Sequence, residues 1–164
     1  MLQGKTVLLA VSGGDTAYNM PNVVQQLKKL HCNIHVLMTE NAVNFAAPAV
    51  FEKLTGNKCL IDTFDRNFEF SVEHVSLGKQ ADLVLIASAT ADVIGKIVNG
   101  IADDMLTTTV MSCACPILVS PSMNCNMYQK QIVQENLQKL KRFGYEIISP
   151  EEDLAEYICK KMEI

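Results

Sequence analysis

The chain has 164 residues, of which 49% are hydrophobic and 20% are charged, which suits one folded unit with a sizeable buried core. A net charge of -4 excludes the basic surface of a nucleic-acid-binding protein, and no apolar run reaches the about 18 residues of a membrane span. The first five residues do not resemble a signal peptide, so we expect a cytoplasmic protein.

Strand and helix patterns alternate through the first half of the chain. Residues 5–11 form an apolar run typical of a buried parallel strand, and a glycine-containing turn follows. Pro21 then begins a helical stripe that ends at Leu30, and residues 33–38 predict a second strand. Further along we expect a helix at 48–55, a third strand at 58–62 and an irregular loop at 63–73.

The second half repeats this alternation. Residues 81–87 predict the strongest strand, and we expect helices at 90–99 and 101–112. A fifth strand at 116–120, a long amphipathic helix at 126–143, a sixth strand at 145–148 and a final helix at 151–161 complete the pattern.

Repeated β-α units with short connections predict a single α/β domain over residues 1–164. The expected architecture is a Rossmann-like, doubly wound parallel sheet of six strands in the order 3-2-1-4-5-6, with helices on both faces. In such sheets ligands bind beyond the carboxyl ends of the strands, at the switch point. Loops that follow strands are therefore the places to look for functional residues.

Two such loops carry glycines and hydroxyl groups. The first reads Ser12-Gly13-Gly14-Asp15-Thr16, where backbone N–H groups could approach an anion, although an ordinary turn explains it equally well. The second, Ser88 to Asp92, would allow a flat ring or a phosphate to come close, or it could simply cap the next helix.

A third loop and one histidine add groups that bind ligands or transfer protons. Asn124, after the fifth strand, can hydrogen-bond a ligand carboxylate or can cap a helix. His74 can take a proton near neutral pH, although a lone histidine is more often structural. Asp103 and Asp104 are neighbours on an expected helix, where side chains point about 100° apart, so they need not converge.

The six cysteines are interpreted as reduced thiols of a cytoplasmic protein. Cys113-Ala114-Cys115 lacks the two-residue gap of a redox pair or zinc knuckle, and we interpret it as small, buried apolar residues. No metal-ligand spacing is visible, so no metal site is expected.

Several motifs together resemble one enzyme family. In chain order they are the glycine-rich loop followed by Ala17-Tyr18, the His74-x-x-Leu77 element, the run Gly100-Ile101-Ala102-Asp103-Asp104-Met105-Leu106-Thr107-Thr108, and the Pro121-x-Met123-Asn124-x-x-Met127 element. This combination resembles the homo-oligomeric flavin-containing cysteine decarboxylases, and in particular the N-terminal domain of the bacterial bifunctional phosphopantothenoylcysteine decarboxylase/synthetase. The resemblance covers nearly the whole chain.

The resemblance implies FMN bound between the subunits of a homotrimer, with trimers assembled further into a dodecamer. It implies that His74 is the active-site histidine, that Asn124 grips the substrate carboxylate and that Met123 contacts the substrate. The cofactor residues that it implies are Ser12, Gly13, Gly14, Thr16, Thr39, Ser88, Ala89, Thr90, Asp92, Thr107 and Met127.

The implied reaction is FMN-dependent decarboxylation of 4′-phosphopantothenoylcysteine to 4′-phosphopantetheine in coenzyme A biosynthesis. Oxidation of the cysteine to a thioaldehyde supplies the electron sink that loss of carbon dioxide needs. A fused or separate synthetase domain is the partner that the resemblance implies.

The sequence departs from the family pattern at Asp15, Asn19, Ser88 and Asp92, which puts the strength of FMN binding in question. Compared with the coenzyme A enzymes, we also expect the substrate lid to be missing between residues 150 and 151. Two other functions stay open for these reasons: a peptidyl-cysteine decarboxylase of lantibiotic maturation, and a non-catalytic FMN-binding regulatory subunit.

Overall fold

The computed structural model describes residues 1–61 and 70–162, and the side chains of all these residues except 70–74. Six parallel strands form one sheet in the order β3-β2-β1-β4-β5-β6, as predicted. The strands are β1 (Thr6–Val11), β2 (Asn33–Met38), β3 (Leu60–Ile61), β4 (Leu83–Ala89), β5 (Ile117–Pro121) and β6 (Glu146–Ile147). β1 pairs with both β2 and β4, so the direction of winding reverses at this strand and the switch point lies at its carboxyl end.

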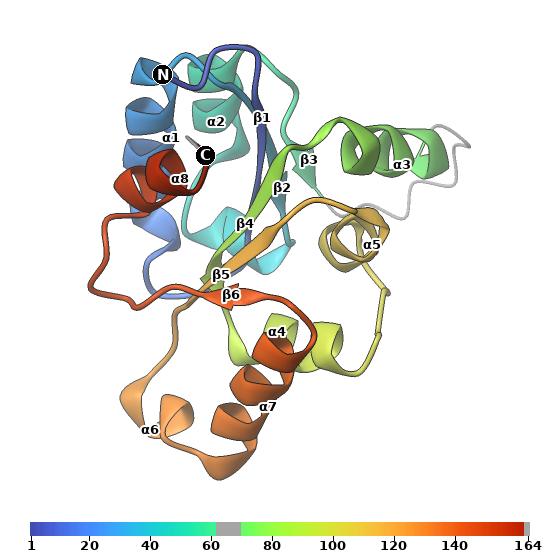
Figure 1. Cartoon of the computed structure of the whole chain (residues 1–164), viewed down its shortest axis with the longest axis vertical. Coiled ribbons are helices and arrows are strands. Elements are labelled where there is room, and N and C mark those ends of the chain that lie inside the picture. Colours follow the sequence, from blue (N-terminus) through green and yellow to red (C-terminus); the bar gives the residue numbers. More distant parts are fainter. Residues whose placement is uncertain (62–69, 163–164) are drawn as a thin grey trace.

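Helices cover both faces of the sheet (Figure 1). One face carries α1 (Met20–Lys29), α2 (Pro48–Thr55) and α8 (Leu154–Met162). The other face carries α3 (Phe70–Gln80), α4 (Ala91–Val98), α5 (Met105–Ser112) and α7 (Gln131–Arg142). Within the described residues, no helix is long and apolar enough to cross a lipid bilayer.

The alternation of side chains along β1 divides the core into two layers. Val7, Leu9 and Val11 pack under α1, α2 and α8, whereas Leu8 and Ala10 pack against the helices of the opposite face. All five side chains are almost completely buried. A strand buried on both faces must be apolar throughout, which is why this segment reads as a continuous hydrophobic run.

The carboxyl edge of the sheet carries three short helical segments. The 3₁₀ turn η1 (Ala17–Asn19) leads into α1, and a second 3₁₀ turn, η2 (Asn41–Asn44), follows β2. The four-residue helix α6 (Cys125–Tyr128) follows β5. All three come directly after a strand and line up at the edge where a ligand is expected.

Several predicted boundaries are wrong. The single helix expected at 126–143 is two helices, α6 and α7, because Lys130 adopts an extended conformation with φ -60° and ψ 133°. The helix expected to begin at residue 101 begins at Met105, because the extended backbone of Asp104 caps it. The strand expected to end at residue 87 continues to Ala89, so Ser88 belongs to β4 and not to the loop after it.

The first turn of α3 was not predicted from the sequence. The irregular loop expected at 63–73 lies partly outside the described residues, but residues 70–73 belong to α3. This helix has few apolar positions, and Leu77 is its buried contact to the core. Gly78 lies so close to α5 that an added Cβ would come 2.7 Å from Ser112 Oγ. Packing against α5 therefore supports a helix that hydrophobic periodicity alone does not predict.

Candidate functional site

Two buried serines join β1 to β4 at the carboxyl edge of the sheet. Ser12 Oγ donates a hydrogen bond to Ser88 O (2.5 Å), and Ser88 Oγ donates to Ser12 O (2.9 Å). Both side chains are shielded from solvent, with exposures of 1% and 0%. Reciprocal bonds between adjacent strands hold the two following loops in register, and a buried hydroxyl in this place requires such a partner.

The loop after β1 is closely packed at both of its glycines, and at Gly14 the neighbouring side chains are buried. A Cβ on Gly13 would lie 2.4 Å from Asn41 Nδ2, and one on Gly14 would lie 2.7 Å from Ser88 Oγ and 2.9 Å from Ser122 Oγ. The N–H of Gly14 donates to Ser88 Oγ (3.1 Å). Glycine at these two positions thus lets the loop backbone lie close to the side chains of Asn41, Ser88 and Ser122.

The same loop presents unused hydrogen-bond donors. In the part of the chain that the structure describes, the backbone N–H groups of Gly13 and Asp15 have no hydrogen-bond partner. The neighbouring N–H of Thr16 is satisfied by Ser122 Oγ at 3.2 Å. Free backbone donors in a glycine-containing turn are suited to hold the oxygen atoms of an anionic ligand.

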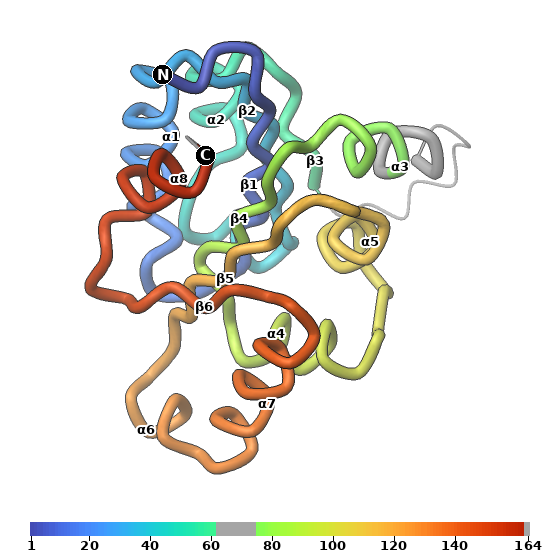
Figure 2. Tube along the Cα trace, viewed as in Figure 1, coloured from blue at the N-terminus to red at the C-terminus, as the bar shows by residue number. Residues whose placement is uncertain are grey.

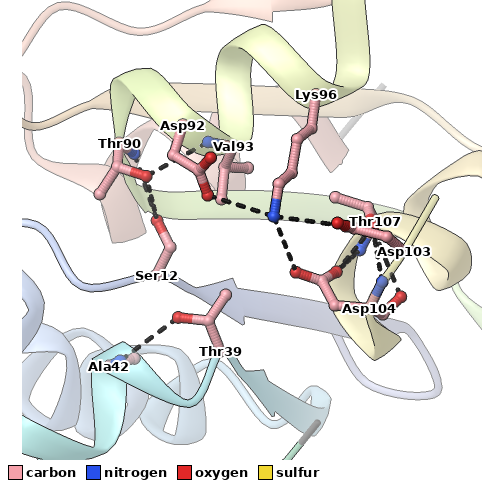
Figure 3. A network of polar contacts seen from close by, with 10 residues as sticks. All are labelled: Ser12, Thr39, Ala42, Thr90, Asp92, Val93, Lys96, Asp103, Asp104 and Thr107. Carbon is pink, nitrogen blue, oxygen red and sulfur yellow. Dashed lines mark hydrogen bonds and ion pairs between the residues drawn. The ribbon is translucent and has the colours of Figure 1, made fainter. Parts of the chain in front are cut away.

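A cavity of about 320 Å³ opens beside this loop, and we call it the Ser12 cavity. Its walls come from the segments after β1, β2 and β4, from α4 and from the residues just before α5. The lining residues are Ser12, Thr39, Glu40, Asn41, Thr90, Asp92, Val93, Lys96, Asp103 and Asp104. Figure 3 shows the hydroxyls of Ser12 and Thr90 in contact, with Thr39 facing them from the β2 side. The volume lies within the range of small-molecule sites.

The three hydroxyl groups of this cavity differ in how far the protein itself uses them. Ser12 Oγ donates to Ser88 O, accepts the N–H of Thr90 (3.2 Å) and lies 3.3 Å from Thr90 Oγ1, so it is already fully hydrogen-bonded. Thr90 Oγ1 accepts the N–H of Val93 to cap α4, and Thr39 Oγ1 accepts the N–H of Ala42 (3.3 Å). A hydroxyl can make more than one hydrogen bond, so those of Thr39 and Thr90 can cap a helix and still bind a ligand.

Lys96 gathers three carboxylates on the far wall of the cavity (Figure 3). Its Nζ lies 3.4 Å from Asp92, 3.3 Å from Asp103 and 4.0 Å from Asp104. The expectation that Asp103 and Asp104 need not converge is therefore wrong for this chain. It assumed helical geometry, whereas both residues precede α5 in non-helical backbone.

The charges of this cluster stabilise one another. Burial acts to lower the pKa of Lys96, but hydrogen bonds to Asp103 and Asp92 and their negative charges outweigh it, so the pKa is raised above its usual value. The ammonium therefore stays charged across the physiological range. With one cation against three carboxylates, the wall carries a net negative charge.

Thr107 lies behind this wall. It is completely buried, and its hydroxyl donates to Asp104 Oδ1 (2.6 Å), which also accepts the N–H of Thr107 (2.7 Å). This reciprocal capping box fixes the start of α5 and aims Asp104 toward Lys96. Thr107 thus supports the cavity and does not line it.

A second cavity, of about 520 Å³, lies on the other side of the first loop, and we call it the Met123 cavity. It is lined by Asp15, Thr16, Pro121, Ser122, Met123, Cys125, Tyr128, Gln129, Ser149, Pro150 and Glu151. Asp15 borders this cavity and not the Ser12 cavity. Figure 2 shows the course of the connection between β6 and α8, where the lid was expected to be missing, and Ser149, Pro150 and Glu151 of this connection line the cavity.

Asn124 stands next to the Met123 cavity at the start of α6. Its Oδ1 accepts the N–H of Asn126 (2.8 Å) and so caps the helix. The side chain is exposed, and the amide Nδ2 has no hydrogen-bond partner among the described residues. The capping interpretation is thus confirmed, and a pair of N–H donors still remains for a ligand.

The structure brings most of the predicted site residues to one edge, but over two cavities. Ser12, Thr39, Thr90 and Asp92 line the Ser12 cavity, and Thr16 and Met123 line the Met123 cavity. The segments that separate the two cavities contain Gly13, Gly14, Ser88 and Ala89. Ala89 O accepts the N–H of Ser122 (2.9 Å), and this hydrogen bond links β4 to the loop after β5.

Two of the predicted site residues, Met127 and His74, are not assigned to either cavity by the structure. Met127 lies on α6 with 47% of its surface exposed, and it lines neither of these cavities. His74 belongs to α3, which packs against α5, and its side chain is outside the described residues. The role assigned to each stays a prediction.

The sequence analysis missed Lys96 as a member of the site. The available signal was the spacing of Asp92 and Lys96, because an acid and a base four residues apart on a helix face each other. The Asp104-x-x-Thr107 capping pattern could likewise have placed the helix start at Met105.

Comparison with known proteins identifies relatives over almost the whole chain. The family model described as Flavoprotein matches residues 1–163. The coenzyme A biosynthesis bifunctional protein CoaBC of Bacillus subtilis is 40% identical over 152 residues, which are 93% of this chain and 37% of that protein. The chain therefore spans little more than a third of the length of this curated relative.

Solved structures agree with this result. The FMN-dependent cysteine decarboxylase SpaF is 31% identical, with a TM-score of 0.88 over 99% of this chain and 98% of its own. TvaF, an FMN-dependent cysteine decarboxylase from thioviridamide biosynthesis, is 26% identical with a TM-score of 0.86, over 98% of this chain and 99% of its own.

Proposed function

The chain belongs to the flavoprotein family, and from that premise we propose that it is an FMN-dependent decarboxylase that converts 4′-phosphopantothenoylcysteine to 4′-phosphopantetheine. The assignment of this substrate rests on the 40% identity with the bifunctional coenzyme A biosynthesis protein of Bacillus subtilis. The product belongs to coenzyme A biosynthesis, and a fused or separate synthetase domain is the expected partner.

The residues present at the carboxyl edge fit FMN. The turn at Gly13 and Gly14 has no room for a Cβ and offers unpaired N–H groups, and the hydroxyls of Ser12, Thr39 and Thr90 surround the adjoining cavity. These residues would hold the cofactor. Bound there, FMN supplies a two-electron oxidant for the cysteine side chain, which makes the carboxylate able to leave as carbon dioxide.

The protein's own groups bind and position the substrate. The free Nδ2 of Asn124 donates to the cysteinyl carboxylate, and Met123 shapes the adjacent cavity. Holding the carboxylate at a fixed place beside the cofactor loop lowers the entropy cost of reaction. His74 is the group assigned to move the proton, because imidazole exchanges protons near neutral pH.

The charges of the Ser12 cavity raise a question about affinity. Asp92, Asp103 and Asp104 face it, and Lys96 is the cation that lies among them. We propose that the Lys96 ammonium offsets the carboxylates enough for an anionic cofactor to bind at the edge. The strength of that binding is then sensitive to each carboxylate.

A peptidyl-cysteine decarboxylase is the second candidate, and the lining of the Met123 cavity favours it. Among the described residues that line the Met123 cavity, two are acidic, Asp15 and Glu151, and none is cationic. Such a cavity offers no counter-charge to a phosphorylated substrate but accepts the C-terminal cysteine of a peptide.

Mass spectrometry of the purified FMN-loaded protein distinguishes these functions. Incubation with 4′-phosphopantothenoylcysteine is expected to give a product lighter by about 44 mass units, the loss of carbon dioxide. A loss of about 46 units would mean that reaction stops at the enethiol. Turnover of a peptide with a C-terminal cysteine, with no change in the phosphorylated compound, would overturn the first proposal in favour of the second.

We propose further that the chain assembles as a homotrimer, and that trimers form a dodecamer. Val43 and Phe45, beside the Ser12 cavity, and Ile101, before α5, expose 37%, 42% and 45% of their surface. Exposed apolar side chains around a cavity favour a subunit interface there. Light scattering with size-exclusion chromatography tests this, and a monomer at micromolar concentration would contradict it. The six free thiols favour the cytoplasm as the place of action.

A further inference from the structure

A third cavity, of about 610 Å³, lies between α1 and the connection from β6 to α8, and we call it the α1 groove. Figure 1 shows this connection running beside α1 before it enters α8. One wall of the groove comes from η1 and α1, the other from residues 150–154, and Ser120 and Pro121 of β5 lie between them.

The α1 groove continues the Met123 cavity. The two cavities share Thr16, Pro121, Pro150 and Glu151 among their lining residues. A ligand whose carboxylate is held by Asn124, next to the Met123 cavity, can therefore extend toward α1. The Ser12 cavity, where the cofactor is proposed to bind, shares no lining residue with the α1 groove.

A buried hydroxyl in the α1 groove is not used by the protein. Ser120 is 9% exposed and points to the face covered by α1 and α8, because Leu118, two residues earlier on β5, packs on that face. Among the described residues, Ser120 Oγ has no hydrogen-bond partner. The similarly buried hydroxyls of Ser12, Ser88 and Ser122 all bond to backbone groups. Because buried hydroxyls normally have partners, Ser120 indicates that a ligand supplies one.

Side-chain amides line the α1 wall of the groove. Asn19, Asn22, Gln26 and Lys29 recur every three or four residues, so they share one face of α1 and of the turn before it. Asn22 Nδ2 donates to Asn19 Oδ1 (2.6 Å), and within the described part of the chain the amide of Gln26 has no partner. A side-chain amide offers a donor and an acceptor, which match the C=O and N–H of another amide.

The size of this wall suits an extended chain. The seven residues from Asn22 to Lys29 rise by about 10 Å along the helix, which is the length of about three residues of an extended peptide. The wall is therefore long enough to face more than one amide group of a ligand.

The opposite wall of the groove is acidic. Glu151, Glu152 and Asp153 lie on it, and Asp153 Oδ1 also accepts the N–H of Glu156 (2.9 Å) to cap α8. Lys29 is the one cation among the described lining residues, so three carboxylates stand against one ammonium. This charge favours a neutral or cationic ligand group in the groove over an anionic one.

We propose that the α1 groove binds the amide-bearing arm joined to the amino group of the substrate cysteine, an inference that rests on the decarboxylase function proposed above. The Ser120 hydroxyl and the amides of Asn22 and Gln26 hydrogen-bond the amide groups of the arm. Both candidate substrates carry such an arm, which is the pantothenoyl chain in one and the residues preceding a C-terminal cysteine in the other.

The two kinds of arm differ in the charge that they bring. A peptide with a basic residue before its cysteine places a cation against Glu151 and Glu152. The phosphopantothenoyl arm ends in a phosphate, which must avoid these carboxylates and pair with Lys29. Lys29 and Glu152 are therefore the residues whose substitution distinguishes the two sources.

Calorimetric titration of the FMN-loaded protein tests the proposal with two probes that end in serine and cannot be oxidised at a thiol. They are 4′-phosphopantothenoylserine and the acetylated peptide Ala-Lys-Ala-Ser. Ser120→Ala should weaken binding of at least one probe about two- to tenfold, the effect of one lost hydrogen bond, and Gln26→Ala should act in the same direction. Urea unfolding of Ser120→Ala should match the parent chain, because no hydrogen bond within the protein is lost.

Gln138→Ala is the matched control for Gln26→Ala, since Gln138 is an exposed residue of α7, and it should leave both affinities unchanged. Lys29→Gln should weaken the phosphorylated probe alone, and Glu152→Gln the lysine peptide alone, each about two- to fivefold. The probe that responds identifies the source of the arm.

Unchanged affinities in both Ser120→Ala and Gln26→Ala, or no measurable binding of either probe to the parent protein, would overturn the proposal. Because the serine probes need no turnover, this result is independent of the decarboxylase function. Probe binding that depends on Ser120, with no decarboxylation of either cysteine compound, would overturn the function and keep the groove as a binding site. Decarboxylation with probe affinities that ignore Ser120 and Gln26 would do the reverse.

Discussion

Replacement of Gly14 by alanine tests the idea that the first loop is built for close backbone approach. The new Cβ would lie 2.7 Å from Ser88 Oγ, 2.9 Å from Ser122 Oγ and 2.9 Å from Ser88 Cβ. Both serines are buried, with exposures of 0% and 7%, so neither can rotate into solvent. The loop or the serines must move, and the bond from Gly14 N–H to Ser88 Oγ at 3.1 Å is then lost.

The expected cost follows from these contacts. Overpacking of a tight interior site costs about 1 to 3 kcal/mol, and one lost hydrogen bond costs about 1 kcal/mol. Gly14→Ala should therefore lower the free energy of unfolding by about 2 to 4 kcal/mol. It should also lower the FMN content of the purified protein, because the N–H groups of Gly13 and Asp15 move with the loop.

Gly95→Ala is the matched control for the same chemical change. Gly95 lies inside α4, and an added Cβ would meet no atom within 4 Å. Alanine is favoured over glycine in a helix by about 0.5 to 1 kcal/mol, so this variant should be slightly more stable and should keep its flavin. Urea unfolding of the two variants and their absorbance at flavin wavelengths make the comparison. Equal stability for Gly14→Ala and the parent chain would refute the reasoning.

Three further predictions follow from single groups. His74→Asn should lower decarboxylation at least about 100-fold in the product-mass assay while FMN absorbance is kept, and equal turnover would remove the role assigned to His74. Asp92→Asn should tighten FMN binding about two- to fivefold in fluorescence titrations, because it frees Lys96 from one carboxylate 3.4 Å away, and weaker binding would contradict this. The pKa of Cys59 is raised to about 12 by burial and by Glu52, so the folded state loses stability as pH rises from about 9 toward 12, because only the unfolded chain ionises there. Between pH 8 and pH 10, urea unfolding should show a loss about 1.4 kcal/mol larger for the parent chain than for Cys59→Ala, and parallel curves would contradict the burial argument.

The positions and order of the strands could be predicted from local pattern. β2 and α2 have the predicted bounds, and the sheet has the predicted order, because a strand buried on both faces must be a continuous apolar run. The loops after β1, β4 and β5 were located by the same reasoning. Parallel strands bring their carboxyl ends to one edge, so residues distant in sequence had to meet there.

The functions of individual side chains depended on backbone detail that no periodicity encodes. The predicted helix at 101–112 kept Asp103 and Asp104 apart, but Asp104 instead caps α5 in an extended conformation and both carboxylates reach Lys96. Asp103 and Asp104 lie in non-helical backbone before α5, so the offset of about 100° between neighbouring side chains of a helix does not apply to them.

The sequence by itself determined the fold class, the edge at which a ligand is expected and the family to which the chain is similar. Apolar runs, turn residues and motifs are local, and they are readable without coordinates. Only the tertiary structure showed that Ser88 bonds Ser12, that Asp15 borders one cavity while Asp92 borders the other, and that Cys113 and Cys115, which were predicted to be buried, are partly exposed. Contacts between loops depend on where each strand ends, to within one residue, and side chains alternate in direction at every residue.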